Sequence, residues 1–399
     1  MNKSDFSFLF KGFKTSLLLF GLLFLFVSTP VSAGTMTGYG VEFGSVSDFA
    51  NLSNKGKANF VTLTVPSDSK PSNWQSILDT AAANGIKVVI YVGWQSNQIC
   101  QGSAAWTWNG SDWQLNSLGT QFMDFIAGYI KGGGQGFLAL YTVHEPYNWE
   151  HSKQCVPQDA PRKLYRMLKR EAANRGLTGG QLPLFADIGI VPSDFYPEFC
   201  DYCSTWYYVN GECGGGSWSN RLNTCLAKLR THYQNLMATS PNSALVPKAQ
   251  SFGMSAPSSS YSGGYQMPTA TEMEDLGKTM ISDLKANFNG NFVFDWYVWQ
   301  GIYSHTLKNS PGGDLSYQVM ANVYNASGGT GTPPPITPTP TPSGNPADTD
   351  GDGDADIDDF KLWINNYSKI LTGKTNGDFT NNGKINLLDY GVWLNYYPL

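Results

Sequence analysis

The segment YTVHEP, from Tyr141 to Pro146, places a histidine and a glutamate side by side at the end of an apolar run. A carboxylic acid at the end of a buried strand can transfer a proton to or from a bound molecule. A glutamate in a surface loop, paired with a Lys or Arg, is the alternative interpretation. Glu145 is therefore the first candidate for a catalytic residue, and His144 could hydrogen-bond a substrate hydroxyl beside it.

Two stretches near the C-terminus space their oxygen-bearing side chains as calcium-binding loops do. The first is DTDGDGDADIDD at 348–359 and the second is DFTNNGKINLLD at 378–389. In both, oxygen-bearing residues occupy loop positions 1, 3, 5 and 12, and a glycine at position 6 allows the sharp turn. Crowded carboxylates need a cation to neutralise them, so we expect two Ca²⁺ sites rather than a solvated acidic tail. The expected ligands are Asp348, Asp350, Asp352, Asp354 through its carbonyl, and Asp359 in the first loop, and Asp378, Thr380, Asn382, Lys384 through its carbonyl, and Asp389 in the second.

The cysteines of the chain favour disulfides. Their number is even, and an even number in an exported chain is typical of a disulfide framework. The segment CDYC at 200–203 also has the spacing of a zinc-binding pair, but the next two cysteines do not repeat it. The pairing cannot be read from the sequence, although Cys100 with Cys155 is reasonable because both follow expected strands. The six are Cys100, Cys155, Cys200, Cys203, Cys213 and Cys225.

The elements that must position these residues alternate between short apolar runs and amphipathic helical segments. Nearly continuous apolar runs are typical of parallel strands buried on both faces. Eight strand–helix alternations in this length predict a (β/α)8 barrel, with the doubly wound open sheet as the competing α/β arrangement. No glycine-rich phosphate turn follows the first strand, which favours the barrel. The expected strands are 37–43, 59–65, 87–94, 136–146, 182–189, 204–209, 245–253 and 291–301.

Residues 1–33 have the pattern of a secretory signal peptide. A basic start precedes the apolar run LLLFGLLFLFV, and VSA at 31–33 offers small residues for cleavage. The apolar run is short for a membrane span, so we expect cleavage rather than an anchor, and no later run is long enough to cross a membrane. Removing these residues takes away three Lys and one Asp and moves the formal net charge from −5 to −7. The expected product is extracellular, and its charge gives no sign of a nucleic-acid partner.

Four parts follow from these patterns: the signal peptide at 1–33, a barrel at 34–327, a linker at 328–346 and a small module at 347–399. The linker is rich in Pro and Thr, which hold an extended path. In the module, DGDGDADIDDF followed by NNGKINLLDY resembles the dockerin domains of secreted bacterial enzymes, which are small, all-α and calcium-binding. The resemblance implies a cohesin-type partner and attachment to a scaffold or cell surface. Thr380 departs from the Asn or Asp usual in that family, and Ala355 from a larger aliphatic residue.

The arrangement of a secreted barrel, a Pro–Thr linker and a dockerin-like module resembles that of polysaccharide-degrading enzymes. HEP at 144–146 is similar to the motif at the fourth strand of many retaining barrel glycosidases, in which the Glu is the acid/base. That resemblance implies a second Glu at the end of the seventh strand, but this chain has Gln250 there. An amide cannot act as a nucleophile or titrate, so Gln250 is expected to bind a substrate hydroxyl or to orient a reacting group.

Another carboxylate must then complete the pair that glycoside hydrolysis usually requires. Asp187, at the end of the fifth strand, is the first choice for the catalytic partner of Glu145. A helix cap or an ion pair with Arg is the structural alternative for Asp187. Other carboxylates near strand ends are Glu42, Asp201 and Asp295.

Aromatic residues cluster at the strand ends, where they could pack against sugar rings. Trp299 resembles the eighth-strand tryptophan that floors a sugar subsite in barrel glycosidases. Packing in the core is the alternative for each ring, because strand alternation points half of them outward. The expected substrate-binding aromatics are Trp94, Tyr207, Trp296 and Trp299.

These observations predict an extracellular glycoside hydrolase-like barrel that acts on a polysaccharide, with a calcium-binding, dockerin-like tail. Two alternatives remain open. One is a non-catalytic carbohydrate-binding barrel displayed on a scaffold by its dockerin. The other is a disulfide-stapled structural component whose calcium module promotes assembly.

Overall fold

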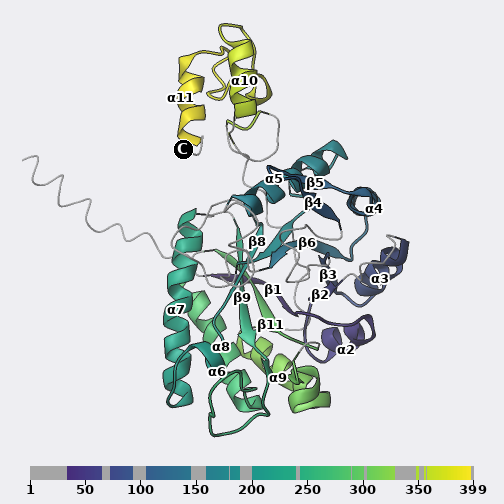
Figure 1. Ribbon diagram of the computed structural model, residues 1–399, viewed down its shortest axis with the longest axis vertical. Coiled ribbons are helices and arrows are strands. Elements are labelled where there is room, and N and C mark those ends of the chain that lie inside the picture. The colour runs from purple at the N-terminus through teal and green to yellow at the C-terminus, as the bar shows by residue number, and fades with distance from the viewer. Residues whose placement is uncertain are drawn as a thin grey trace, which may run out of the picture.

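The computed structural model describes residues 34–64, 72–92, 105–144, 159–178, 180–188, 200–239, 243–288, 290–300, 303–328, 347–349, 355 and 357–396. Eight parallel strands form a closed barrel in the order β1-β11-β9-β8-β7-β6-β3-β2 (Figure 1). The prediction of a (β/α)8 barrel is thus confirmed, and so is each of the eight expected strands. Their bounds are β1 Thr35–Val41, β2 Phe60–Thr64, β3 Lys87–Tyr91, β6 Phe137–His144, β7 Leu184–Asp187, β8 Tyr202–Trp206, β9 Ala244–Gln250 and β11 Asn291–Tyr297.

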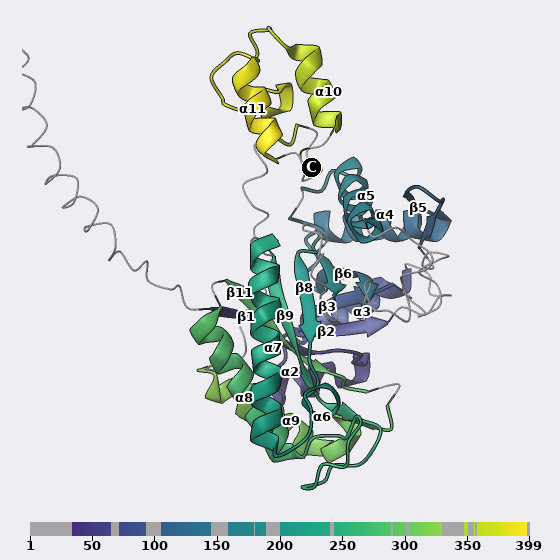
Figure 2. The same cartoon turned by 60° about the vertical axis from the view of Figure 1, so that its left-hand side comes forward.

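Helices surround the barrel and follow the strands in chain order. After β7 the chain enters 189–199, which lies outside the described residues. Figures 1 and 2 show the long α7 beside α8 on the outside of the barrel. The barrel helices are α2 Phe49–Asn54, α3 Ser72–Ala83, α4 Ser117–Lys131, α5 Ala160–Asn174, α7 Trp218–Thr239, α8 Ala270–Asn287 and α9 Gly313–Ala326. Within the described ranges, no helix is long and apolar enough to cross a membrane.

Short elements decorate the ends of the barrel. The antiparallel hairpin of β4 (Trp106–Trp108) and β5 (Trp113–Leu115) lies between β3 and α4. The short helix α6 (Val209–Glu212) follows β8, and β10 (Phe252–Gly253) pairs with β12 (His305–Thr306). Three further short helical segments are η1 Val46–Asp48, η2 Lys308–Gly312 and η3 Lys374–Asn376.

The alternation of side chains along β1 and β11 sorts residues between the barrel interior and the helical layer. Tyr39 points outward, because its hydroxyl donates to the carbonyl of Met320 on α9 and accepts from Trp296 Nε1. Position 40 lies on the opposite side of β1 from Tyr39. A Cβ on Gly40 would lie 2.3 Å from the Phe60 carbonyl, so β1 and β2 approach closely at this glycine. Side chains alternate with a period of two, so Glu42 and Asp295 face the interior.

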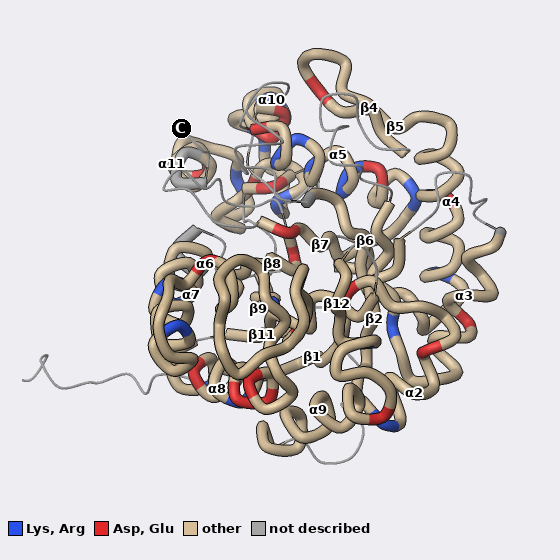
Figure 3. Tube along the Cα trace, turned by 60° about the horizontal axis from the view of Figure 1, so that its bottom comes forward, with Lys and Arg blue, Asp and Glu red and all other residues tan. Residues whose placement is uncertain are grey.

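Charged residues are mostly on the outer helices and loops, as Figure 3 shows. This is the usual arrangement, because burying a charge without a partner is costly. Among the described residues, exceptions inside the barrel are the charged side chains of Glu42, Asp187, Lys248 and Asp295, which have relative exposures of 0 or 1%.

The C-terminal module contains two helices, α10 (Ile357–Asn366) and α11 (Leu387–Tyr396). Their aromatic residues pack on each other, with Trp363 and Trp393 both buried and Phe360 between them. Ile385 and Phe379, from the second predicted calcium loop, complete this small core. A core of this kind needs further stabilisation in so small a unit, which bound metal often supplies.

Candidate functional site

The four buried ionisable residues gather toward the carboxyl end of the barrel. Asp187 is the last residue of β7, and Glu42 is the first residue after β1. Lys248 and Asp295 each precede the last residue of their strand, β9 or β11, by two positions. The carboxyl end of the strands is the face at which (β/α)8 enzymes place their active sites.

Lys248 joins two carboxylates across the barrel. Its Nζ lies 2.5 Å from Asp187 Oδ2 and 2.7 Å from Glu42 Oε2. Strand β9 is not next to β7 or β1 in the barrel, so both contacts must cross the interior. The two carboxylate oxygens are therefore no more than 5.2 Å apart, since the contacts of 2.5 and 2.7 Å share one nitrogen.

Lys248 is charged in this environment. Burial by itself lowers the pKa of an amine, but here the nearby carboxylates of Asp187, Glu42 and Asp295 outweigh burial and raise the pKa of Lys248. An ammonium this close to two carboxylates stabilises their negative charge in turn.

Asp295 differs from Glu42 and Asp187 because it makes no ion pair with Lys248 among the described residues. Neither of its carboxylate oxygens has a hydrogen-bond partner among the described residues. Burial, and then the negative charge of Glu42, raise the pKa of Asp295 well above its usual range, although Lys248 acts in the opposite direction. The raised pKa of Asp295 favours its protonated form.

Aromatic rings enclose the cluster. Lys248 Nζ lies 4.8 Å from the centre of the Tyr297 ring and 5.7 Å from that of Tyr141, and both rings attract a cation. The Tyr141 hydroxyl is also 3.4 Å from Asp187 Oδ2. Next to Tyr297, the rings of Tyr208 and Trp206 stack in sequence, with centroids 5.7 and 4.5 Å apart. These rings close the part of the barrel end formed by β8, β9 and β11.

Gln250 holds the main chain with its whole amide group. Its Oε1 accepts from the backbone N–H of Asn210 at 2.8 Å. Its Nε2 lies within hydrogen-bond distance of three carbonyls, those of Asn210, Phe252 and Gln266, at 3.1, 3.1 and 3.2 Å. The side chain is 0% exposed. Through these hydrogen bonds, the residue at the seventh-strand position connects the loops that follow β8 and β9.

A second layer fixes Asn210 in place. The Arg221 guanidinium donates from Nε and Nη2 to Asn210 Oδ1, and its flat face lies 4.2 Å from the Tyr261 ring centre. The disulfide between Cys213 and Cys225 closes the loop between α6 and α7. These contacts link the segment around Asn210, which bonds Gln250, to helix α7.

The disulfide prediction is confirmed for four cysteines. Cys200 pairs with Cys203, and Cys213 pairs with Cys225, so these four do not form a zinc site. Cys100 and Cys155, for which a pairing was predicted, lie outside the described residues.

Two predicted site residues at the fourth and third strands also lie outside the described residues, namely Glu145 and Trp94. His144 is the last residue of β6, and its main chain is in register with Asp187 on β7. Strand β6 therefore ends beside the strand that carries Asp187.

Three predicted sugar-binding aromatics contact the helical layer instead of the acidic cluster. Trp296 is fully buried and donates from Nε1 to Tyr39. Trp299 is 1% exposed, and its Nε1 donates to Asp48 Oδ2 at 2.9 Å. The hydroxyl of Tyr207 lies 2.9 Å from His232 Nε2 on α7. Packing and hydrogen bonding within the fold account for all three rings.

From the sequence, Asp201, Glu42 and Asp295 were predicted only as further carboxylates, and Lys248 was not predicted as a site residue. Asp201 precedes β8, at the opposite end of the barrel from the cluster, where it accepts from Lys169 Nζ at 2.8 Å and from Leu184 N. A signal for Lys248 was present, because one lysine in the apolar run LVPKAQ is unusual for a strand buried on both faces.

The second predicted calcium loop turns two carboxylates inward. Asp378 accepts from the backbone N–H of Asn382 and of Gly383, both at 2.9 Å. Asp389 accepts from the N–H and hydroxyl of Thr380, at 2.9 and 2.7 Å. Both acids are nearly fully buried, and neither has an ion pair among the described residues. Two buried carboxylates without a counter-charge in this part of the chain fit a cation that prefers oxygen ligands.

The first loop is described at its two ends. Asp348 and Asp359 are buried, and Asp359 Oδ1 accepts from the N–H and the hydroxyl of Thr349. Asp350, Asp352 and Asp354 lie outside the described residues. Within the described part of the chain, no three His, Cys, Asp or Glu side chains are grouped closely enough to hold a metal, so a cation in the second loop would also need oxygens from Thr380, Asn382 and a carbonyl.

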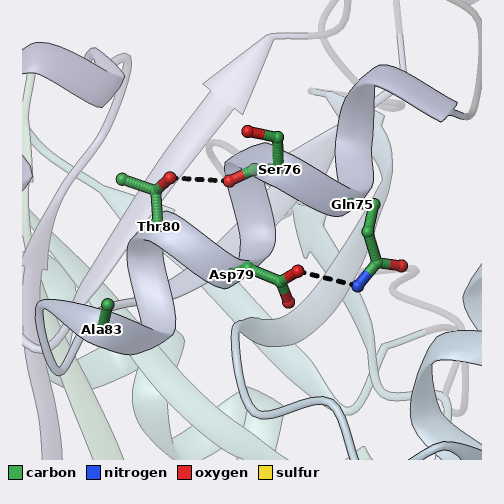
Figure 4. A pocket seen from close by; sticks show the side chains of 5 residues that line it. All are labelled: Gln75, Ser76, Asp79, Thr80 and Ala83. Atoms are coloured by element: carbon green, nitrogen blue, oxygen red, sulfur yellow. Dashed lines mark hydrogen bonds between the residues drawn. The ribbon is translucent and has the colours of Figure 1, made fainter.

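One surface hollow occurs away from these sites. It is lined by residues of a single helix, α3, and Figure 4 shows that its polar groups bond to one another. Gln75 donates to Asp79, and the Thr80 hydroxyl donates to the carbonyl of Ser76. This hollow is the outer face of a helix and brings together no groups that could do chemistry.

Several solved structures are similar to this chain at low sequence identity. No family model and no curated protein matches it. Similar solved structures include an active-site mutant of a β-1,3-glucanosyltransferase from Rhizomucor miehei in complex with laminaritriose, with 12% identity, a TM-score of 0.43, and coverage of 70% of this chain and 91% of that one.

Two others come from different organisms. A GH5_18 variant from Bifidobacterium longum, in complex with Manβ1-4GlcNAc, has 9% identity, a TM-score of 0.47 and coverage of 72% and 78%. A GH5-4 broad-specificity endoglucanase from an uncultured bovine rumen ciliate has 12% identity, a TM-score of 0.47 and coverage of 74% and 96%. At these identities and scores the function has to be argued from the side chains of this chain.

Proposed function

We propose that this protein is an extracellular glycoside hydrolase that acts on a plant or microbial polysaccharide. The observation that carries the proposal is the cluster of Glu42, Asp187 and Asp295 at the carboxyl end of the barrel, beside the strand that leads into Glu145. Glycoside hydrolysis needs two carboxyl groups, one as a proton donor and one with a negative charge.

The proposed roles follow from charge. Glu145 is the general acid, which protonates the oxygen of the leaving sugar. Asp187 is the charged partner, which attacks the sugar or activates a water, because Lys248 at 2.5 Å stabilises its negative charge. Gln250 acts on neither Glu145 nor Asp187. Its side-chain amide instead holds the loops around the site by hydrogen bonds to their main chain.

The competing function is carbohydrate binding without hydrolysis. The tight ion pairs of Lys248 with Asp187 and Glu42, all buried, favour it, because a carboxylate held in this way must be released before it can reach a substrate. The two functions make different predictions for the same experiment.

Substitution of the two proposed catalytic residues is that experiment. We would measure hydrolysis and binding of a panel of neutral and acidic polysaccharides by the full chain, by Glu145→Gln and by Asp187→Asn. General acid catalysis contributes roughly 10²–10⁴-fold, so each variant should lose hydrolysis by at least a factor of about 10² and keep binding. Asp314→Asn removes an exposed carboxylate on α9 and should change neither. A wild-type protein that binds a polysaccharide but hydrolyses none would establish the binding function instead.

The C-terminal module is proposed to bind two Ca²⁺ ions and to attach the barrel to a cohesin-type scaffold or a cell surface. The buried carboxylates of Asp378 and Asp389 support the second ion, with Thr380, Asn382 and the carbonyl of Lys384 as further ligands. Bound calcium would neutralise these acids and stabilise the loop. The first ion would take Asp348 and Asp359 together with Asp350, Asp352 and the carbonyl of Asp354.

A further inference from the structure

The proposed mechanism gives Lys248 no step of its own, so the complete burial of this charged residue still needs an explanation. It is one of the largest fully buried side chains of the molecule, at 0% exposure, and it lies between carboxylates from two different sides of the barrel. A buried ammonium is costly unless charged partners and hydrogen bonds compensate for lost water. An apolar residue of similar length would fill the same space without that cost, so the charge itself needs a reason.

The groups that face Lys248 come from several elements around the barrel. They are Glu42 after β1, Asp187 on β7, Asp295 and Tyr297 on β11 and Tyr141 on β6, and Tyr208 after β8 lies near Glu42 and Asp187. Three are carboxyl groups, and Lys248 is the one cation among these facing groups. Without it, the carboxyl groups would be buried next to one another, and like charges at short distance cannot all remain ionised.

The contacts of Lys248 also fix the positions of the Asp187 and Glu42 carboxyl groups. Lys248 Nζ lies within ion-pair distance of one oxygen of Asp187 and one of Glu42, which keeps these two oxygens no more than 5.2 Å apart. Asp295 remains outside this pair, with neither oxygen hydrogen-bonded among the described residues. The cluster thus contains two carboxyl groups paired with Lys248 and one that is not paired with it.

We propose that Lys248 is the positioning residue of this site, and that its ammonium keeps Asp187 and Glu42 ionised and fixed at the carboxyl end of the barrel. This assignment rests on the proposed function in one respect: in that function, Lys248 maintains the charged carboxylate that hydrolysis requires. The electrostatic part of the assignment can be tested without any activity.

The test compares the pH dependence of stability in the full chain, Lys248→Met and Lys248→Arg. In Lys248→Met the two carboxyl groups lose their cation, so their pKa values in the folded state should rise above the unfolded values of about 4. Groups with a raised folded-state pKa lose stability as the pH rises through this range. The unfolding constant of Lys248→Met, relative to wild type, should therefore increase up to about tenfold per pH unit for each such carboxyl above pH ~4.

Lys248→Arg is the matched control, because it keeps the positive charge and changes the geometry. Its unfolding constant should differ from that of wild type by a factor that stays constant with pH. If the ratio of the unfolding constants of Lys248→Met and wild type is also independent of pH, Lys248 does not control the ionisation of Asp187 and Glu42, and the proposal is overturned.

Two additional substitutions keep the test decisive. If Lys248→Met does not fold at any pH, the variant that combines it with Glu42→Gln and Asp187→Asn should fold, and its stability relative to wild type should not fall further as the pH rises above ~4. Failure of that variant to fold would mean that Lys248 serves packing alone, which overturns the proposal.

Kinetics separate this inference from the proposed function. If the wild type hydrolyses a polysaccharide, Lys248→Met should move the acidic limb of the kcat profile upward in pH, whereas Lys248→Arg should leave that limb in place. If the wild type hydrolyses nothing while the stability ratios behave as expected, the proposed function fails and the role of Lys248 stands.

Discussion

Gln250→Glu is the substitution that best tests the description of the seventh strand. It would restore the residue type found at this position in the glycosidases that the sequence resembles. In this structure, however, Nε2 of Gln250 faces three backbone carbonyls at 3.1–3.2 Å. A carboxylate would place a negative oxygen against these carbonyls and would donate no hydrogen bond.

The cost can be estimated from those contacts. In Gln250→Glu, the protonated carboxyl group keeps one donor of the two that the amide supplies, so one carbonyl contact is lost at about 1–3 kcal/mol. Ionisation is worse, because burial and the carbonyls raise the folded-state pKa of the new carboxyl group above the unfolded value of about 4.3. The folded protein then keeps a proton that the unfolded chain releases, so stability falls by about 1.4 kcal/mol per pH unit above that value. We expect a loss of about 5 kcal/mol at pH 7.

Urea unfolding followed by circular dichroism at pH 4 and pH 7 would measure this. Gln250→Met is the matched control, since it removes the amide without adding a titrating group, and its loss should be the same at both pH values. A Gln250→Glu protein as stable as wild type at pH 7, or one with increased hydrolysis, would refute our description of Gln250 as a residue that holds the main chain.

Three further predictions concern other parts of the chain. Replacing Cys213 and Cys225 together by Ala removes the bond that closes a short loop, which should lower the unfolding free energy by about 3 kcal/mol; an unchanged urea midpoint would contradict this. Trp299→Ala should cost about 3–5 kcal/mol, because the ring is buried and its Nε1 bonds Asp48, whereas a loss of polysaccharide affinity at full stability would place the ring in the binding site. Calcium should raise the melting temperature of the C-terminal module in the full chain, and Asp389→Asn should reduce this shift; calorimetry that finds no shift in wild type would rule out the metal site.

The strands could be predicted because their signal is local. Runs such as KVVIY at 87–91 are apolar at nearly every position, and a strand covered on both faces requires that pattern wherever it lies in the barrel. The hairpin of β4 and β5 was missed, because its two short strands carry a tryptophan pair but no clear alternation within a long connection. Local pattern also underlies the prediction of the calcium loops in the C-terminal module, whose expected ligands are neighbours in the sequence.

The roles of individual aromatic residues could not be predicted in the same way. Trp296 and Tyr297 are adjacent in the chain, and both are large and aromatic. The pleat of β11 sends one to the helical layer, where it bonds Tyr39, and the other to the acidic cluster, where it contacts Lys248. The direction depends on the register of β11 with its neighbours, which only the closed barrel fixes.

The sequence by itself determined the eight strands, the order of strands and helices, and the spacing of the expected calcium ligands, because each of these depends on residues close together in the chain. The tertiary structure decided which carboxyl groups meet. Glu42, Asp187 and Lys248 are far apart in the sequence, and they come together because closing the sheet turns the inner faces of β1, β7 and β9 toward one space. Gln250 likewise became a residue that holds the main chain once the loops after β8 and β9 folded against its amide.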